Sequence, residues 1–284
     1  MSNTTIISTE EKAAGYLSDA SLHQAVTAVN TDGYVILGNA VDVAHLDILL
    51  ERTLSDLEQI LARKDVPFNF NTGNVQQDPP PFAPYLFDDV LKNEFVIQIT
   101  RAILGDGVKN IMYSGNTALP GGTRQPVHPD GGQLWSGLTH PTPAYNLVVN
   151  VPLVAVSPAN GSTEFWPGTH LDTGDFLQKG SLRVSEDDLE KRAAQVPPFQ
   201  PTIPRGSVVI RDLRMWHAGM PNTTDQPRPM IAMIHSAGWW GSGAFGAPRA
   251  SAPFFEHPDL RFAVQYTDGA SDYITNNQAY DLRK

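Results

Sequence analysis

Two short segments of the chain carry residue types that can bind a metal ion. His128 and Asp130 lie two residues apart in segment 125–130 (Gln-Pro-Val-His-Pro-Asp). In an extended segment, side chains at i and i+2 project to the same side. His217, in segment 214–219 (Arg-Met-Trp-His-Ala-Gly), follows much later in the chain. Two histidines and a carboxylate, with the other coordination positions open, are the ligand set of non-heme iron(II) oxygenases, so His128, Asp130 and His217 are predicted to bind iron and form the catalytic centre.

A histidine and an aspartate at this spacing are common by chance, but their surroundings favour a metal site. His217 follows residues 206–212 (Gly-Ser-Val-Val-Ile-Arg-Asp), a predicted strand with a turn before it. Arg228 comes shortly after His217 and precedes a proline. The planar guanidinium of an arginine can pair bidentately with the distal carboxylate of 2-oxoglutarate. The alternative is that Arg228 is an ordinary surface arginine.

Composition narrows the class of protein. The chain has 284 residues, 41% of them hydrophobic, which is enough to bury a sizeable core in a single domain. Cysteine is absent, so disulfides, thiolate metal sites and cysteine nucleophiles are excluded. The net charge of −10, with no basic cluster, argues against a nucleic-acid partner. No secretory signal and no apolar run of membrane-spanning length is visible, so we expect a cytoplasmic protein without a membrane partner.

The helices and strands that must position these residues are predicted from the periodicity of apolar residues and from residues that interrupt helices and strands. Helices are predicted over residues 9–31, 43–62, 88–104 and 185–194, and residues 65–87 are too rich in proline for a helix or a central strand. Short apolar runs separated by Gly, Pro and Asn predict strands at 34–37, 111–114, 144–151, 161–165, 207–212 and 230–236. This pattern is typical of a mainly β sandwich or barrel with flanking helices.

The flanking blocks carry a family resemblance. They are residues 65–70 (Asp-Val-Pro-Phe-Asn-Phe), 74–80 (Asn-Val-Gln-Gln-Asp-Pro-Pro), 113–116 (Tyr-Ser-Gly-Asn), 160–170 (Asn-Gly-Ser-Thr-Glu-Phe-Trp-Pro-Gly-Thr-His) and 203–212 (Ile-Pro-Arg-Gly-Ser-Val-Val-Ile-Arg-Asp). Together with the segments around His128, His217 and Arg228, they resemble the phytanoyl-CoA dioxygenase (PhyH) family of Fe(II)/2-oxoglutarate-dependent oxygenases, most closely an antibiotic-biosynthetic member. The resemblance runs through most of residues 60–235.

The resemblance implies a double-stranded β-helix, also called a jelly roll or cupin-like core. It would occupy residues 106–240 of one dioxygenase domain, after a helical part over 1–105 and before an irregular tail. It implies that His128, Asp130 and His217 hold Fe(II), and that Arg228 anchors the far carboxylate of 2-oxoglutarate. Gln125 and Thr163 are further candidates for the cosubstrate region, although a solvent-facing amide and a turn residue are equally simple interpretations. The candidates for the substrate pocket are Gln76, Gln77, Asn116 and Trp135.

The implied reaction is oxidation of a C–H bond in a small secondary metabolite by O2, with release of succinate and CO2. Hydroxylation, desaturation, ring formation and alcohol-to-ketone oxidation all remain open. So does the substrate, which could be an alkaloid, a terpenoid or an aminoglycoside. The alternative class is a non-oxidative cupin-like isomerase or a small-molecule binding module, which need not retain the full set of histidines, aspartate and arginine. A homodimer is a reasonable expectation from base rates alone.

Overall fold

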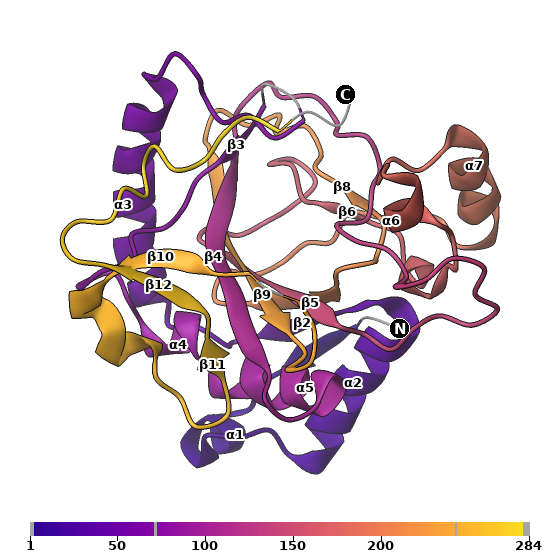
Figure 1. Ribbon diagram of the computed structural model, residues 1–284, viewed down its shortest axis with the longest axis horizontal. Helices are drawn as coiled ribbons and strands as arrows, with labels where there is room; N and C mark the ends of the chain where they lie inside the picture. The colour runs from indigo at the N-terminus through magenta and orange to yellow at the C-terminus, as the bar shows by residue number, and fades with distance from the viewer. Residues whose placement is uncertain (1–2, 71–72, 242, 281–284) are drawn as a thin grey trace.

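A large mixed sheet forms the centre of the computed structural model, which describes residues 3–70, 73–241 and 243–280. Its strands are β1 (Thr4–Ile6), β2 (Tyr34–Gly38), β3 (Asn74–Gln76), β4 (Lys109–Ala118), β5 (Asn146–Pro152), β7 (Val208–Asp212), β9 (Arg228–Ser236) and β11 (Arg261–Phe262). Their order is β1-β2-β7-β5-β9-β4-β11, and β3 pairs with β4 (Figure 1). The neighbours from β2 to β4 are all antiparallel, whereas β1 and β11 join the sheet in parallel.

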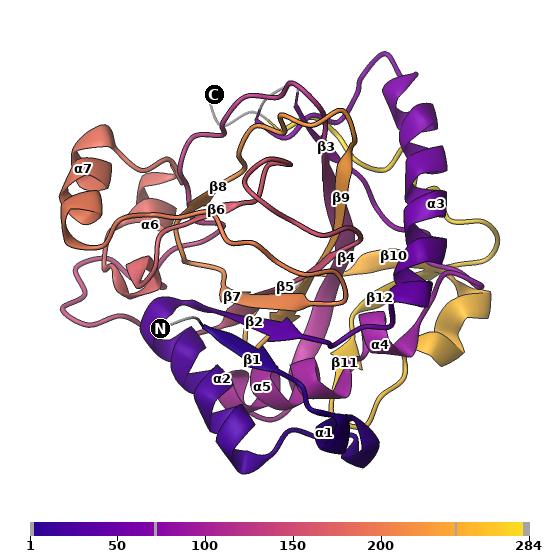
Figure 2. The ribbon, with the colours of Figure 1, turned by 180° about the vertical axis from the view of Figure 1, so that it is seen from behind.

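Two small sheets accompany the large one. β6 (Glu164–Phe165) pairs antiparallel with β8 (His217–Ala218), and β10 (Phe245–Pro248) pairs parallel with β12 (Val264–Thr267). In Figures 1 and 2, β6 and β8 lie on one side of β5, β7 and β2, with long loops around them. The metal-ligand candidate His217 is the first residue of β8, so this small sheet brings one predicted ligand over the large sheet.

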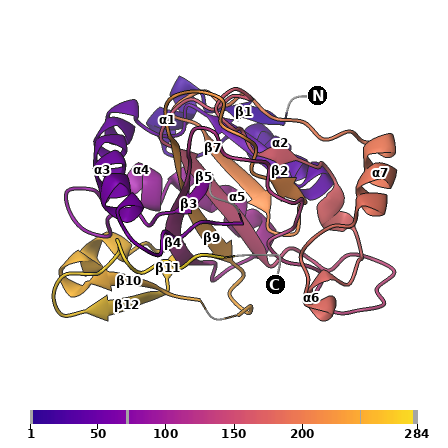
Figure 3. The same cartoon turned by 90° about the horizontal axis from the view of Figure 1, so that it is seen from above.

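Helices surround the large sheet. They are α1 (Thr9–Ala14), α2 (Asp19–Asp32), α3 (Val43–Leu61), α4 (Asp88–Leu91), α5 (Glu94–Leu104), α6 (Phe176–Lys179) and α7 (Glu186–Gln195), with 3-10 turns at Thr169–Leu171 and Arg249–Phe255. Figures 1 and 2 show α2 and α5 against the face opposite β6 and β8. Seen from above, α3 and α7 lie at opposite ends of the molecule (Figure 3). None of the helices in the described ranges is long and apolar enough to cross a membrane.

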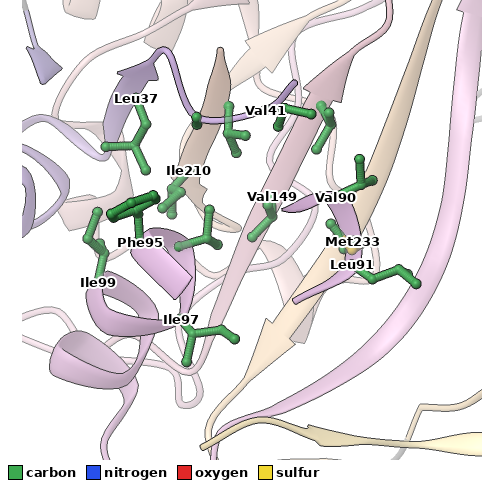
Figure 4. Packing of buried hydrophobic residues seen from close by; sticks show 14 of the residues in the cluster. Leu37, Val41, Val90, Leu91, Phe95, Ile97, Ile99, Val149, Ile210 and Met233 are labelled. Atoms are coloured by element: carbon green, nitrogen blue, oxygen red, sulfur yellow. The ribbon is translucent and has the colours of Figure 1, made fainter. Parts of the chain in front are cut away.

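The main core lies between the sheet and the helix layer. Side chains along β5 alternate, so that Leu147, Val149 and Val151 join this core while Val148 and Asn150 face the other way. Figure 4 shows Phe95 and Ile99 of α5 close to Leu37 and Ile210 of the sheet. Full burial of an aliphatic or aromatic side chain of this size contributes roughly 1.5–3 kcal/mol. This core makes the sheet a rigid floor for the residues on its opposite face.

The expected class, mainly β with flanking helices, is confirmed at the level of a large mixed sheet with helices around it. The single helix predicted over 9–31 is wrong, because Gly15 ends α1 at φ +76° and Ser18 caps a separate α2. The helix predicted over 88–104 is likewise split, since Asn93 caps α5. Apart from residues 71 and 72, which lie outside the described ranges, segment 65–87 is irregular except for β3 and an exposed turn at residues 83 and 84.

The tail after Trp239 contains β10, β11 and β12, which the sequence did not predict. These strands are two to four residues long and only partly buried, so their sequences show no clear alternation of apolar and polar residues.

One buried histidine of the sheet gives stability a pH dependence. His235 on β9 is buried, its Nδ1 lies 2.9 Å from Thr100 Oγ1, and burial lowers its pKa to about 3. In the unfolded chain, the imidazole of His235 takes up a proton near pH 6.5, whereas in the folded chain it does so only near pH 3. Between these values the unfolded chain binds more protons, so the free energy of unfolding decreases as the pH falls. The free energy of unfolding should therefore depend less on pH in His235→Asn than in the wild type. Between pH 6.5 and 5, we predict that its slope against pH is smaller by up to about 1.4 kcal/mol per pH unit.

Urea unfolding at a series of pH values measures this slope. The control is His140→Asn at an exposed position, which should leave the slope unchanged. An unaltered slope in the His235 variant would contradict the prediction.

Candidate metal centre

The three predicted metal ligands meet because two distant segments pair through their backbones. His128 N–H donates to His217 O and His217 N–H donates to His128 O, each at 3.0 Å. Two residues further, Asp130 N–H donates to Leu213 O at 3.0 Å. This short antiparallel pairing sets the imidazole of His217 beside that of His128, with ring centroids 4.5 Å apart.

The side-chain atoms of the three residues converge on one point. The Asp130 carboxylate lies 3.9 Å from His128 Nε2 through Oδ1 and 3.6 Å from His217 Nε2 through Oδ2. All three ligand atoms lie within 4.8 Å of one another. Neighbouring ligands of a metal with bonds of about 2.1 Å stand roughly 3 Å apart, so a small adjustment suffices for coordination.

Backbone carbonyls fix the tautomer of both imidazoles. His128 Nδ1 lies 2.7 Å from Pro126 O, and His217 Nδ1 lies 3.0 Å from Met215 O. A carbonyl oxygen can only accept, so each Nδ1 carries the proton and each Nε2 presents a lone pair to the cluster. Metal-binding histidines are oriented in the same way by a hydrogen bond from the second ring nitrogen.

The local electrostatics give all three groups the protonation state that a metal requires. Burial, reinforced by the nearby Arg211, lowers the pKa of His217 to about 3, and burial also lowers the pKa of His128. Desolvation opposes ionisation of Asp130, but Arg211 and the two histidines outweigh it and lower the pKa of Asp130. Neutral imidazoles and an ionised carboxylate bind a divalent cation without releasing protons.

The cluster opens into a cavity of about 270 Å³ above the large sheet. His128, Asp130 and His217 share its wall with the predicted Arg228, Gln125, Thr163, Gln76 and Asn116. Other lining residues come from β5, β7 and β9 and from the residue after β7; they include Val148, Asn150, Arg211, Leu213, Met230, Ala232 and Ile234. The structure thus brings most of the predicted site residues together around one space.

Two predicted substrate residues lie elsewhere. Gln77 is buried outside this cavity, where its amide donates to Thr53 O at 2.6 Å and accepts from Thr117 Oγ1 at 2.9 Å. Gln76, the residue before it in the chain, lines the cavity, as the alternation of an extended segment requires. Trp135 is 62% exposed and does not line the cavity in the part of the chain described.

Gln125 connects two segments at the cavity wall. Its Oε1 accepts from Gly219 N–H at 2.7 Å, and its Nε2 donates to Asn69 O at 3.2 Å. A Cβ at Gly219 would lie 2.5 Å from this oxygen, so only glycine allows the contact. The side chain therefore fixes the loop after His217, while its position at the wall leaves it next to bound ligands.

Arg228 is the most deeply buried cation of the site. It is 2% exposed at the start of β9, and burial lowers its pKa to about 10. Its Nη2 donates to Gly161 O at 2.8 Å, and its Nε has no partner among the described residues. No carboxylate of the described residues pairs with it, which is costly for a buried charge and indicates an anionic ligand.

Residues 211–214 hold functional side chains that the sequence analysis did not select. Arg211 on β7 contacts the Asp130 carboxylate directly and lines the cavity. Arg214 pairs with Asp212 at 2.7 Å and donates to Thr142 O at 2.6 Å, which anchors the loop that follows Asp130. The available signal was a set of three charged residues, two at the end of an apolar predicted strand and one just after it.

Comparisons with known proteins agree with this geometry. The family model described as phytanoyl-CoA dioxygenase (PhyH) matches residues 29–230. The dioxygenase af480 of Aspergillus fumigatus is 26% identical over 171 residues, which are 59% of this chain. The chain spans about half the length of this curated relative, with 50% of it covered.

Solved structures show the same fold at low identity. The non-heme alpha-ketoglutarate-dependent carbocyclase SnoK from nogalamycin biosynthesis has a TM-score of 0.59 and 19% identity, over 78% of this chain and 84% of SnoK. EctD from S. alaskensis has a TM-score of 0.60 and 18% identity, over 94% of this chain and 89% of EctD. EctD has been solved with bound Fe and with 2-oxoglutarate and 5-hydroxyectoine.

The ligand assignment predicts that Asp130→Ala removes metal binding without unfolding the chain. The carboxylate is 36% exposed, so its loss leaves no cavity in the core. We expect the dissociation constant for Fe(II) or Co(II) to rise by more than the roughly 10- to 100-fold typical of an outer-shell change. Anaerobic calorimetry measures the constant, with circular dichroism to verify the fold. Asp225→Ala, in an exposed turn, is the control, and unchanged metal affinity in Asp130→Ala would remove Asp130 from the ligand set.

Proposed function

The chain belongs to the phytanoyl-CoA dioxygenase family of non-heme iron, 2-oxoglutarate-dependent oxygenases, and from this premise we propose that it oxidises a C–H bond of a small molecule. The observation that carries the proposal is the buried Arg228, a cation without a carboxylate partner, in the same cavity as the cluster of His128, Asp130 and His217. One end of this cavity suits a divalent metal, and the other suits a carboxylate.

His128, Asp130 and His217 would hold Fe(II), and Arg228 would pair with the distal carboxylate of 2-oxoglutarate. When bound, iron and 2-oxoglutarate supply the oxidising chemistry, with O2 consumed and succinate and CO2 released. The chain itself positions these groups. His128 and His217 are held by backbone carbonyls, and Arg228 is oriented by Gly161. Asn116 lines the same cavity.

The architecture is part of the proposal. The large sheet and the small β6–β8 sheet would be the two sides of a double-stranded β-helix, with the metal centre between them. The helices before β4 and the segments after β9 pack against the same sheet, which favours one domain. The cavity volume of about 270 Å³ fits a small-molecule substrate beside the cosubstrate. A cavity of this size favours a small molecule over a macromolecule as the substrate.

The alternative, a cupin-like isomerase or binding module without oxidative chemistry, leaves one feature unexplained. Such a protein has no need for a buried arginine without a counter-ion near its metal site. SnoK is named as a carbocyclase, whereas EctD was solved with 5-hydroxyectoine, and a shared fold does not fix the reaction. The reaction type for this chain is therefore left at C–H oxidation.

The role of Arg228 can be tested by spectroscopy. Anaerobic addition of Fe(II) and 2-oxoglutarate should produce a weak visible charge-transfer band in the wild-type protein. In Arg228→Met, loss of a buried charge pair should raise the 2-oxoglutarate concentration at half-maximal band by roughly 100-fold, while metal affinity stays unchanged.

Arg249→Met, at a position that is 62% exposed, is the matched control. An equal half-maximal concentration in the wild type and the Arg228 variant would contradict the anchoring role. The absence of any band and of succinate formation in the wild type would contradict the oxygenase proposal itself.

A further inference from the structure

A second arginine lines the cavity and is not used by the chemistry proposed above. Arg211 projects from β7 in the middle of the large sheet, and its side chain is 7% exposed. Its Nη2 contacts Asp130 Oδ2. Its Nη1 is buried and has no hydrogen-bond partner among the described residues. A buried donor left unpaired costs about 1–3 kcal/mol, so this nitrogen indicates an absent acceptor.

The strand register separates the two arginines. Met112, Ile234, Val148 and Arg211 form one row across β4, β9, β5 and β7, and all four line the cavity. Arg228 lies on β9 as well, at the opposite end from Ile234. Six residues along a strand separate the backbones of these two positions by roughly 20 Å, so the carboxylate that pairs with Arg228 lies in a different row from Arg211. The distal carboxylate of the cosubstrate is therefore not the acceptor that Arg211 Nη1 lacks.

The charges of the cavity point to the kind of molecule. Of the described residues that line it, Asp130 is the only carboxylate, and Arg211 and Arg228 are the only permanent cations. The two positive charges of iron offset the two negative charges of 2-oxoglutarate. One aspartate then stands against two arginines, and the loaded site keeps an excess of one positive charge. An anionic or strongly polar oxygen is favoured there, and an ammonium group is disfavoured.

We propose that Arg211 forms the substrate subsite and binds a carboxylate or carbonyl oxygen of the molecule that is oxidised. The apolar part of the substrate would lie over Met112, Ile234 and Val148, which continue the same row. Because Arg211 also contacts Asp130, the bound oxygen is held next to the metal ligands, and the oxidised carbon lies close to that oxygen. This inference rests on the proposed function. It selects acids and carbonyl compounds over the polycationic substrates that the sequence left open.

Three small probes with the same methyl reporter test the subsite: propionate, propionamide and propylammonium. They are added to anaerobic protein saturated with Fe(II) and 2-oxoglutarate, and proton relaxation of the probe methyl group measures its approach to the paramagnetic iron. We expect saturable enhancement for propionate, weaker enhancement for propionamide and none for propylammonium. In Arg211→Met the apparent dissociation constant of propionate should rise by roughly tenfold or more.

Arg211→Lys keeps the charge and should retain part of the effect, and it decides the test if Arg211→Met fails to load iron. Arg249→Met should behave as the wild type. Equal propionate relaxation in the wild type and the Arg211 variants means direct binding to iron or elsewhere, and overturns the proposal. A preference for propylammonium also overturns the proposal, as does the absence of saturable enhancement with any probe. In either case, Arg211 is a positioning residue for Asp130. The charge-transfer band is recorded first, so failure of the subsite with the band present is distinguishable from failure of the proposed function.

Discussion

The reciprocal backbone hydrogen bonds between His128 and His217 are the interaction on which the site depends. They join two segments that are distant in sequence, and they set both imidazoles and the Asp130 carboxylate around one point. Each Nδ1 is then occupied by a carbonyl of its own segment, so the backbone that brings the histidines together also orients them. A sheet with a helix-packed core on its other face makes this arrangement rigid.

The floor of the cavity is organised by the alternation of side chains along the strands. Leu147, Val149 and Val151 stabilise the fold on one face of β5, and Val148 and Asn150 on the other face line the cavity. The same alternation places Arg228 and Arg211 on the cavity side, at opposite ends of the floor. Asp130 contacts one terminal nitrogen of Arg211, whereas no carboxylate of the described residues pairs with Arg228. Buried cationic groups without sufficient anionic partners are unfavourable. The cavity therefore has a site that favours an anion at each end, and we assign these two sites to the cosubstrate and the substrate.

The sequence predicted the metal ligands because i and i+2 spacing and residue chemistry are local properties. It also predicted most of the central strands, whose apolar runs are uninterrupted. It did not predict the break at Gly15, because a single glycine is compatible with a helix until its neighbours cap a second one. Arg211 was not selected, since its importance arises from the pairing of β7 with β5 and from contact with Asp130. In the sequence, Gln77 and Gln76 are equivalent candidates. They differ in the direction of the side chain, since Gln76 lines the cavity and Gln77 points away from it.

The most direct test of the central claim pairs a change in the cosubstrate with a change in the protein. Charge-transfer titrations compare 2-oxoglutarate with 2-oxopentanoate, which lacks the distal carboxylate, in the wild type and in Arg228→Met. If Arg228 anchors that carboxylate, its removal weakens binding by roughly 100-fold in the wild type and only slightly in the variant. An equal loss in both proteins would show that the carboxylate is held elsewhere, and would contradict the assignment of the two ends of the cavity.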